Sequence, residues 1–152
     1  RNGHDAWQFP QGGLATGESP LDAMYRELCE EVGLDREDVE VLGSTKRWLK
    51  YRLQKQYLRH GSEPLVIGQK QKWYLLRLVS SEQKLRLDLS DSPEFDSWRW
   101  IDYHEPPEQV IFFKRQVYAQ AMNQRLARIN PRLRHRFLSH IDGWYTEVIE
   151  LA

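Results

Sequence analysis

The chain has 152 residues, 40% of them hydrophobic, and carries 22 acidic and 22 basic residues. This length can bury the core of one domain. No apolar run approaches the roughly 18 residues of a membrane span, and no secretory segment is recognisable, so we expect no membrane association. The single Cys29 cannot form an internal disulfide, which favours a cytoplasmic location.

The first predicted element is a strand near Ala6–Phe9, and a loop that contains Gly12, Gly13 and Gly17 follows it. Glycine lets such a loop turn tightly and approach a ligand closely. A pair of glycines is common in ordinary loops, so this signal alone predicts only the turn.

A helix is predicted from about Pro20 to Val32. Ser19 is a favourable N-cap, proline suits the first helical turn, and Gly33 provides a stop just after the end. Apolar residues recur at helical spacing and define the face that we expect to pack on the core. These residues are Leu21, Met24, Leu28 and Val32.

An acidic edge runs beside this apolar face, because Glu27, Glu30 and Glu31 fall within roughly a 100° arc of the helix. The three carboxylates repel one another, and the one arginine that can reach Glu30, Arg26, does not neutralise them. A cluster of hard oxygen ligands suits Mg²⁺ or Mn²⁺. For any isolated pair of glutamates, a solvated helix face is the simpler interpretation.

Strands are predicted within Val39–Leu53 and Lys70–Val79, and shorter ones at Leu85–Leu89 and Trp98–Ile101. From Val110 to about Asn130 the apolar residues recur at helical spacing. Strands flanked by helices at both ends predict an α/β fold in which a sheet lies between helices.

The balanced total charge hides blocks of opposite sign. Residues 1–45 carry 10 acidic and 3 basic residues, whereas residues 46–72 carry 8 basic residues and one acidic residue. Residues 109–141 carry 7 basic residues and no acidic one. The acidic block contains the candidate metal ligands, and the basic blocks are suited to holding phosphates beside it.

The acidic helix and its preceding loop resemble the Nudix box, G-x5-E-x7-R-E-U-x-E-E-x-G-U, where U is aliphatic. Every fixed position matches: Gly12, Glu18, Arg26, Glu27, Leu28, Glu30, Glu31, Gly33 and Leu34. Further segments, WQFPQGG, IGQKQKW, PEFDSWRW and FFKRQVY, resemble the bacterial RNA pyrophosphohydrolases, whose members also cleave dinucleoside polyphosphates. The resemblance covers roughly residues 1–125.

This resemblance implies the Nudix fold, a helix-sheet-helix sandwich around a mixed sheet. Family domains usually have a strand or two before the box, whereas only 11 residues precede it here. We therefore expect a Nudix domain over residues 1–130 that lacks its N-terminal strand or strands. Residues 131–152 are expected to form a C-terminal extension of unknown role, and its last part, Asp142–Ala152, is either a native tail or a foreign extension.

The resemblance also assigns roles. Glu27, Glu30, Glu31 and Glu94 would bind Mg²⁺ or Mn²⁺, with Glu31, Glu94 and Glu30 as the catalytic set and either Glu31 or Glu94 as the general base. Glu18 and Arg26 would tie the loop to the helix, and Gly12, Gly13 and Gly33 would shape the motif. Asp91 and Asp96, which flank Glu94, are expected to be solvated loop residues.

Substrate recognition has to come from outside the box. Residues 46–52 interleave bases with aromatics, which suits a phosphate backbone and stacked bases but also suits an ordinary strand with one face in water. The resemblance points to six substrate-binding residues: Arg1, Tyr51, Gln69, Lys72, Phe113 and Lys114.

The implied reaction is metal-dependent removal of pyrophosphate, or of phosphate in steps, from 5′-triphosphorylated or 5′-diphosphorylated RNA, leaving a 5′-monophosphate and favouring mRNA decay. Hydrolysis of free dinucleoside polyphosphates is the first alternative, since the same catalytic residues would serve it. A non-catalytic RNA-binding module with this fold is the second. The repelling carboxylates argue against that module, because a pure binder does not need them.

Overall fold

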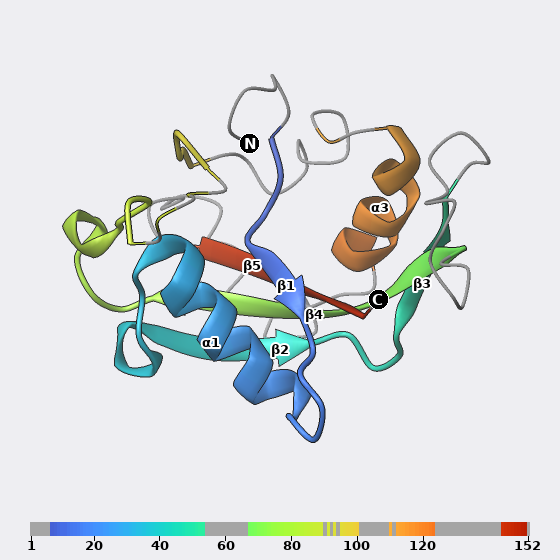
Figure 1. Ribbon diagram of the computed structural model, residues 1–152, viewed down its shortest axis with the longest axis horizontal. Coiled ribbons are helices and arrows are strands. Elements are labelled where there is room, and N and C mark those ends of the chain that lie inside the picture. Colours follow the sequence, from blue (N-terminus) through green and yellow to red (C-terminus); the bar gives the residue numbers. More distant parts are fainter. Residues whose placement is uncertain are drawn as a thin grey trace.

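The computed structural model describes residues 7–53, 67–89, 91, 93, 95–100, 110 and 112–123, and the backbone of 144–151. Within them, five strands form one mixed sheet in the order β1-β5-β4-β2, with β3 also paired to β4 (Figure 1). The strands are β1 Gln11–Gly13, β2 Val39–Ser44, β3 Leu49–Arg52, β4 Gly68–Leu78 and β5 Trp144–Leu151. The β1–β5 pair is parallel and the other pairs are antiparallel.

Helix α1 spans Pro20–Val32, which confirms the predicted helix at both ends. The Ser19 hydroxyl oxygen accepts the backbone N–H of Asp22 at 3.1 Å, as an N-cap does. Gly33 follows the last turn with φ of 72°, a left-handed conformation that costs glycine little. Local signals at the two termini therefore fix the position of α1.

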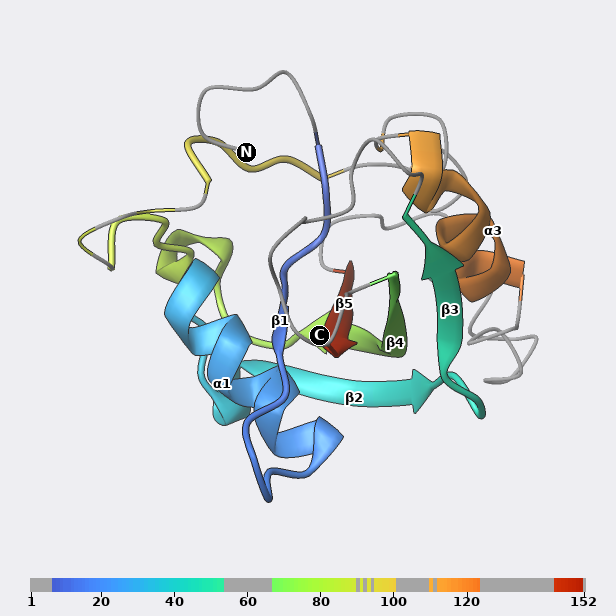
Figure 2. The same ribbon diagram turned by 45° about the vertical axis from the view of Figure 1, so that its right-hand side comes forward.

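Alternation along β4 gives the sheet two apolar faces. Tyr74 and Leu76 pack in the cluster under α1, whereas Trp73 packs in the cluster under α3, Arg115–Asn123. Because neighbouring residues of a strand point to opposite faces, the two helices cover opposite sides of the sheet (Figure 2). The predicted helix-sheet-helix sandwich is confirmed.

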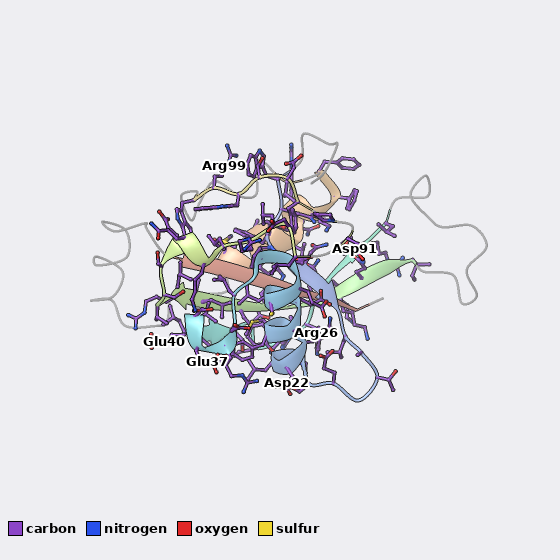
Figure 3. All side chains as sticks on the ribbon, turned by 60° about the vertical axis from the view of Figure 1, so that its left-hand side comes forward. Asp22, Arg26, Glu37, Glu40, Asp91 and Arg99 are labelled. Carbon is purple, nitrogen blue, oxygen red and sulfur yellow. The ribbon has the colours of Figure 1, made fainter. Side chains whose placement is uncertain are left out.

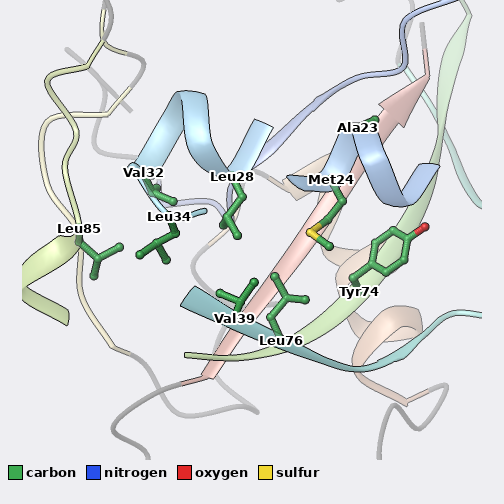
Figure 4. Packing of buried hydrophobic residues seen from close by; sticks show 9 residues of the cluster. All are labelled: Ala23, Met24, Leu28, Val32, Leu34, Val39, Tyr74, Leu76 and Leu85. Carbon is green, nitrogen blue, oxygen red and sulfur yellow. The ribbon is translucent and has the colours of Figure 1, made fainter. Parts of the chain in front are cut away.

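The core under α1 joins the helix to β2, β4 and the segment after η3, Glu82–Lys84 (Figure 4). Three of the four residues predicted for the apolar face, Met24, Leu28 and Val32, are buried there. The prediction for Leu21 is wrong, since this residue is 38% exposed. Leu21 belongs to the first turn of α1 and lies outside the packed cluster.

The predicted strand near Ala6–Phe9 is wrong over its described residues, because residues 7–10 have no regular structure and β1 begins at Gln11. The backbone N–H of Phe9 donates to the Tyr118 hydroxyl at 3.2 Å, and Pro10 has no N–H to donate. The backbone here is thus bound to a side chain of α3 and does not form a ladder.

Leu85–Leu89 is also not a strand. The backbone N–H of Arg86 donates to the carbonyl of Val32 at 3.0 Å, so this segment is bonded to the end of α1. Leu85 still contributes to the core. Residues 98–100 have no strand structure either, and Ile101 lies outside the described residues.

The predicted strand material in Val39–Leu53 forms the two strands β2 and β3, with a bend between them. The second β segment extends from Gly68 to Leu78 as β4, the longest described strand. The helical pattern from Val110 forms the short 3₁₀ helix η4, Phe112–Lys114, and then α3. Residues 124–130 lie outside the described part of the chain.

Strand β5 contributes the C-terminal part of the chain to the sheet. Its backbone pairs in parallel with all three residues of β1 and antiparallel with residues 70–77 of β4. In the described topology β1 joins the sheet through β5. The position of β1 therefore depends on a segment more than a hundred residues away in the sequence.

None of the helices that the structure describes is long and apolar enough to cross a membrane.

Asp38, in the 3₁₀ helix η1 (Arg36–Asp38), anchors the turn before β2. Its side chain is only 4% exposed and accepts hydrogen bonds from Lys84 Nζ at 2.7 Å and from the backbone N–H of Asp35 at 3.0 Å. The hydrogen bond from Lys84, followed by that from Asp35, holds the pKa of Asp38 below its usual value. Its carboxylate therefore stabilises the fold above about pH 4, and this stability is lost as the pH falls through the lowered pKa.

We expect Asp38→Asn to lower the melting temperature by a few degrees at neutral pH, and the difference from wild type to shrink as the pH falls below about 4. Thermal unfolding over a pH series measures this difference, with the exposed Asp96→Asn as the control. A difference that stays constant over the series would contradict the role given to the Asp38 carboxylate.

Candidate active site

Arg26 connects the glycine loop to α1. Its Nε and Nη2 donate to the carboxylate of Glu18 at 3.0 and 3.1 Å, and Nη2 also donates to the carbonyl of Gly13 at 2.7 Å. Figure 3 shows Arg26 on the side of α1 that faces β1. The hydrogen bonds from Arg26, followed by the one from the Ala15 backbone, lower the pKa of Glu18. The pair therefore remains ionised at neutral pH and fixes the loop on the helix.

Glu27 belongs to α1, and its side chain lies between that helix and β1. The residue is only 9% exposed. Burial raises the pKa of its carboxyl, while hydrogen bonds from Arg26 Nη1, at 2.7 Å, and from the backbone of Gly13 oppose that rise. A Cβ atom on Gly12 would lie 1.7 Å from the carboxyl carbon of Glu27. A side chain at position 12 would therefore displace this carboxylate.

Glu30 and Glu31 differ in their surroundings. The Glu30 side chain is 57% exposed and accepts Arg26 Nη1 at 3.2 Å. Glu31 Oε2 accepts the backbone N–H of Gln11, in β1, at 2.9 Å. Glu31 is therefore oriented by the sheet, and Glu30 by its own helix.

The donor set of this helix suits a divalent cation in type, because all three side chains offer hard carboxylate oxygens. Glu27, Glu30 and Glu31 are the residues that would hold Mg²⁺ or Mn²⁺. Arg26 contacts two of them, and within the described residues no three Asp, Glu, His or Cys side chains by themselves form a metal site. Glu94, the fourth predicted ligand, lies outside those residues.

Lys114 contacts β1 from the face of the sheet opposite to α1. It belongs to η4, is only 7% exposed, and donates from Nζ to Gln11 Oε1 at 2.8 Å. Gln11 therefore contacts both the predicted catalytic Glu31 and the predicted substrate-binding Lys114. This brings together residues from α1, β1 and η4.

Tyr51, Gln69 and Phe113 form a second group beside Lys114. The Tyr51 hydroxyl donates to Gln69 Oε1, and its ring stacks on that of Phe113 with centroids 5.9 Å apart. Tyr51 is buried, so a base that stacks on this group would contact Phe113 or the more exposed Phe112. Phe112 is not among the six predicted substrate-binding residues.

Lys72 is placed apart from this group. Alternation along β4 directs Gln69 toward the α3 face and Lys72 toward the α1 face. Lys72 Nζ donates to the carbonyls of Thr45 and Lys46, in the bend between β2 and β3. Its role in substrate binding therefore stays a prediction.

The remaining residues considered in the sequence are two loop aspartates, Arg1 and the single cysteine. Asp91 and Asp96 are exposed, and Arg1 lies outside the described residues. Cys29 contacts Asp35, with Sγ 3.3 Å from Oδ1, and burial raises the pKa of its thiol. A raised pKa disfavours the thiolate that a nucleophile requires.

Gln11 is the residue of this site that the sequence analysis missed. It stands in the quoted segment WQFPQGG, but the pattern gives no sign of its partners. One partner lies 20 residues and the other 103 residues further along the chain. A polar side chain next to the glycines was the only available signal.

Comparison with known proteins identifies the family of the chain. Residues 1–121 match the NUDIX domain. The chain is 82% identical over 124 residues to an RNA pyrophosphohydrolase of Legionella pneumophila (strain Corby), covering 82% of this chain and 71% of that protein. It is 57% identical over 132 residues to an RNA pyrophosphohydrolase of Pseudomonas putida (strain GB-1), covering 87% of this chain and 83% of that protein. The chain therefore belongs to the NUDIX domain family.

Proposed function

We propose that this chain is a divalent-metal-dependent RNA pyrophosphohydrolase. It removes pyrophosphate, or phosphate in steps, from the 5′ end of triphosphorylated or diphosphorylated RNA and leaves a 5′-monophosphate. Such a product would favour mRNA decay. We place the activity in the cytoplasm, which the single Cys29 favours.

The observation that carries this proposal is the position of Gln11 between Glu31 and Lys114. An acidic group, which would hold the metal, and a buried cation, which would hold a phosphate, lie on either side of one edge of the sheet. The high identity to the two relatives supports RNA as the substrate.

Each residue has a proposed part in the reaction. Mg²⁺ or Mn²⁺ held by Glu27, Glu30, Glu31 and Glu94 would neutralise phosphate charge and lower the pKa of the attacking water. Glu31 or Glu94 would act as the general base toward the attacking water. Lys114 binds a phosphate oxygen. Arg26 holds the glycine loop against α1 through its hydrogen bonds to Glu18 and to the Gly13 carbonyl.

Specificity for RNA is proposed to come from charge and aromatic contacts outside the box. The ring of Phe113 would stack on a base. The ring of Tyr51 packs on Phe113, and Gln69 holds Tyr51 by accepting its hydroxyl hydrogen bond. Arg1 and Lys72 would add phosphate contacts. A dinucleoside polyphosphate uses the same catalytic groups but makes fewer contacts with such a surface.

Turnover of a 5′-triphosphorylated oligonucleotide and of diadenosine tetraphosphate over a salt series tests this proposal. With free Mg²⁺ held constant, we expect the RNA reaction to fall more steeply with salt, because each neutralised backbone phosphate releases counterions. Lys114→Ala should lower RNA turnover by about tenfold or more, since a charged contact to phosphate is lost. Tyr51→Ala should lower it by weakening the support of Phe113.

Arg36→Ala is the matched control, because it also removes one cation but from an exposed pair with Asp22. Parallel salt slopes, with Lys114→Ala and Tyr51→Ala both as active as wild type, would favour free dinucleotides as substrates. Binding of RNA without hydrolysis of either substrate would favour the non-catalytic module.

A further inference from the structure

We propose that Gln11 is a positioning residue that couples the phosphate-binding cation Lys114 to the catalytic Glu31 across the edge of the sheet. This inference rests on the proposed function of the same site. Gln11 donates its backbone N–H to Glu31 Oε2 at 2.9 Å and accepts Lys114 Nζ on its side-chain oxygen at 2.8 Å.

The geometry of β1 explains how one residue reaches both layers. The missing Cβ of Gly12 points at the Glu27 carboxylate, so position 12 faces α1. Side chains alternate along a strand, which directs the side chain of Gln11 to the opposite face, where η4 presents Lys114. Its backbone N–H meanwhile meets α1 through Glu31.

The choice of an amide has a chemical consequence. Lys114 is buried, and a buried ammonium needs oxygen acceptors to offset the loss of water. The amide oxygen of Gln11 supplies one without adding negative charge. A glutamate at this position would also accept the hydrogen bond, but its added negative charge beside Lys114 would repel the phosphates of the substrate.

Gln11 therefore acts through Glu31 and Lys114 and contacts neither the phosphate nor the attacking water. Its side chain accepts a hydrogen bond from Lys114, and its backbone N–H binds the carboxylate of Glu31. A change of the side chain alone should alter phosphate binding, because the backbone bond to Glu31 is retained. The expected signature is a change in KM with little change in kcat.

The variants Gln11→Glu and Gln11→Met separate charge from hydrogen bonding. Gln11→Glu should raise KM for triphosphorylated RNA by about tenfold or more, and Gln11→Met by a smaller factor, while kcat stays within about threefold. Gln83→Glu, at an exposed position of η3, adds the same charge elsewhere and should leave both constants unchanged.

Binding of inorganic tripolyphosphate, measured by calorimetry on the same proteins, gives a readout that does not require RNA hydrolysis. Gln11→Glu should weaken this binding by about tenfold or more. In a Lys114→Met background, Gln11→Met should have no further effect, because its partner is already absent. Melting temperatures of all variants exclude a general loss of folding.

The outcomes separate the two proposals. A wild-type protein that hydrolyses no triphosphorylated RNA contradicts the proposed function, and tripolyphosphate binding then still decides the role of Gln11. Wild-type KM and tripolyphosphate affinity in Gln11→Glu, or additive effects of Gln11→Met and Lys114→Met, would overturn the coupling. If Gln11→Glu has a much lower melting temperature than wild type, the role of Gln11 is tested by Gln11→Met and by its combination with Lys114→Met.

Discussion

Glu31→Gln is expected to lower turnover of 5′-triphosphorylated RNA by at least about a hundredfold and to leave the fold intact. The substitution keeps the size of the side chain and removes its charge. The amide oxygen of glutamine can still accept the backbone N–H of Gln11, so the position of β1 is retained. What is lost is a proposed metal ligand and one of the two candidate general bases.

The matched control is Glu37→Gln, which removes one exposed carboxylate from η1 (Figure 3). Steady-state turnover with saturating Mg²⁺, and again with excess chelator, measures both the residue and the metal requirement. We expect wild-type activity from the control, and loss of activity in chelator for every variant. An undiminished rate in Glu31→Gln, or a chelator-resistant wild type, would refute the assigned role.

Gly12→Ala is expected to abolish most of the activity at only a modest cost in stability, because the added methyl would displace the flexible end of the Glu27 side chain. The new Cβ would lie 1.7 Å from the Glu27 carboxyl carbon and about as close to both carboxylate oxygens. Either β1 moves away from α1 or Glu27 leaves its place between them. Both changes disturb the Arg26 and Glu31 contacts to this strand.

Gly13→Ala is the control that the chain itself provides. A Cβ at Gly13 would meet nothing within 4 Å among the described atoms, and the carbonyl that accepts Arg26 is unchanged. We expect its turnover of triphosphorylated RNA to match wild type and its free energy of unfolding in urea to remain within about 0.5 kcal/mol of wild type. Equal turnover of Gly12→Ala and Gly13→Ala would show that β1 is not held closely against Glu27.

The parts of the fold with local causes were predictable from the sequence. Helix α1 has its N-cap, its proline and its terminal glycine within 15 residues, and its bounds were predicted at both ends. The long strand β4 was predicted from its aromatic and branched residues. Both elements would form from these signals in many tertiary settings.

The errors fall where distant partners decide the structure. Phe9 bonds to Tyr118 and Arg86 bonds to Val32, so neither segment forms the strand that its composition suggested. Strand β1 consists of two glycines and a glutamine, which have no strand propensity of their own. It forms because β5 pairs with it, and no local pattern reveals that pairing.

The candidate site also combines local features that the sequence predicts with a distant contact that it does not predict. The spacing of Glu27, Glu30 and Glu31 on one helix follows from the sequence alone, and so does the reach of Arg26 to Glu30. The contact of Lys114 with Gln11 joins residues 103 positions apart, and it depends on how η4 packs against the sheet edge. Sequence spacing carries no information about such a contact.

Analysis of the products formed from triphosphorylated RNA tests the central claim most directly. The purified chain would be incubated with Mg²⁺ and an oligonucleotide labelled at its γ-phosphate, and both the released label and the new 5′ end would be identified. We predict that label appears as pyrophosphate or phosphate, that the RNA becomes 5′-monophosphorylated, and that Glu31→Gln forms neither product at a comparable rate. An RNA that keeps its triphosphate under these conditions, while diadenosine tetraphosphate is cleaved, would contradict the account.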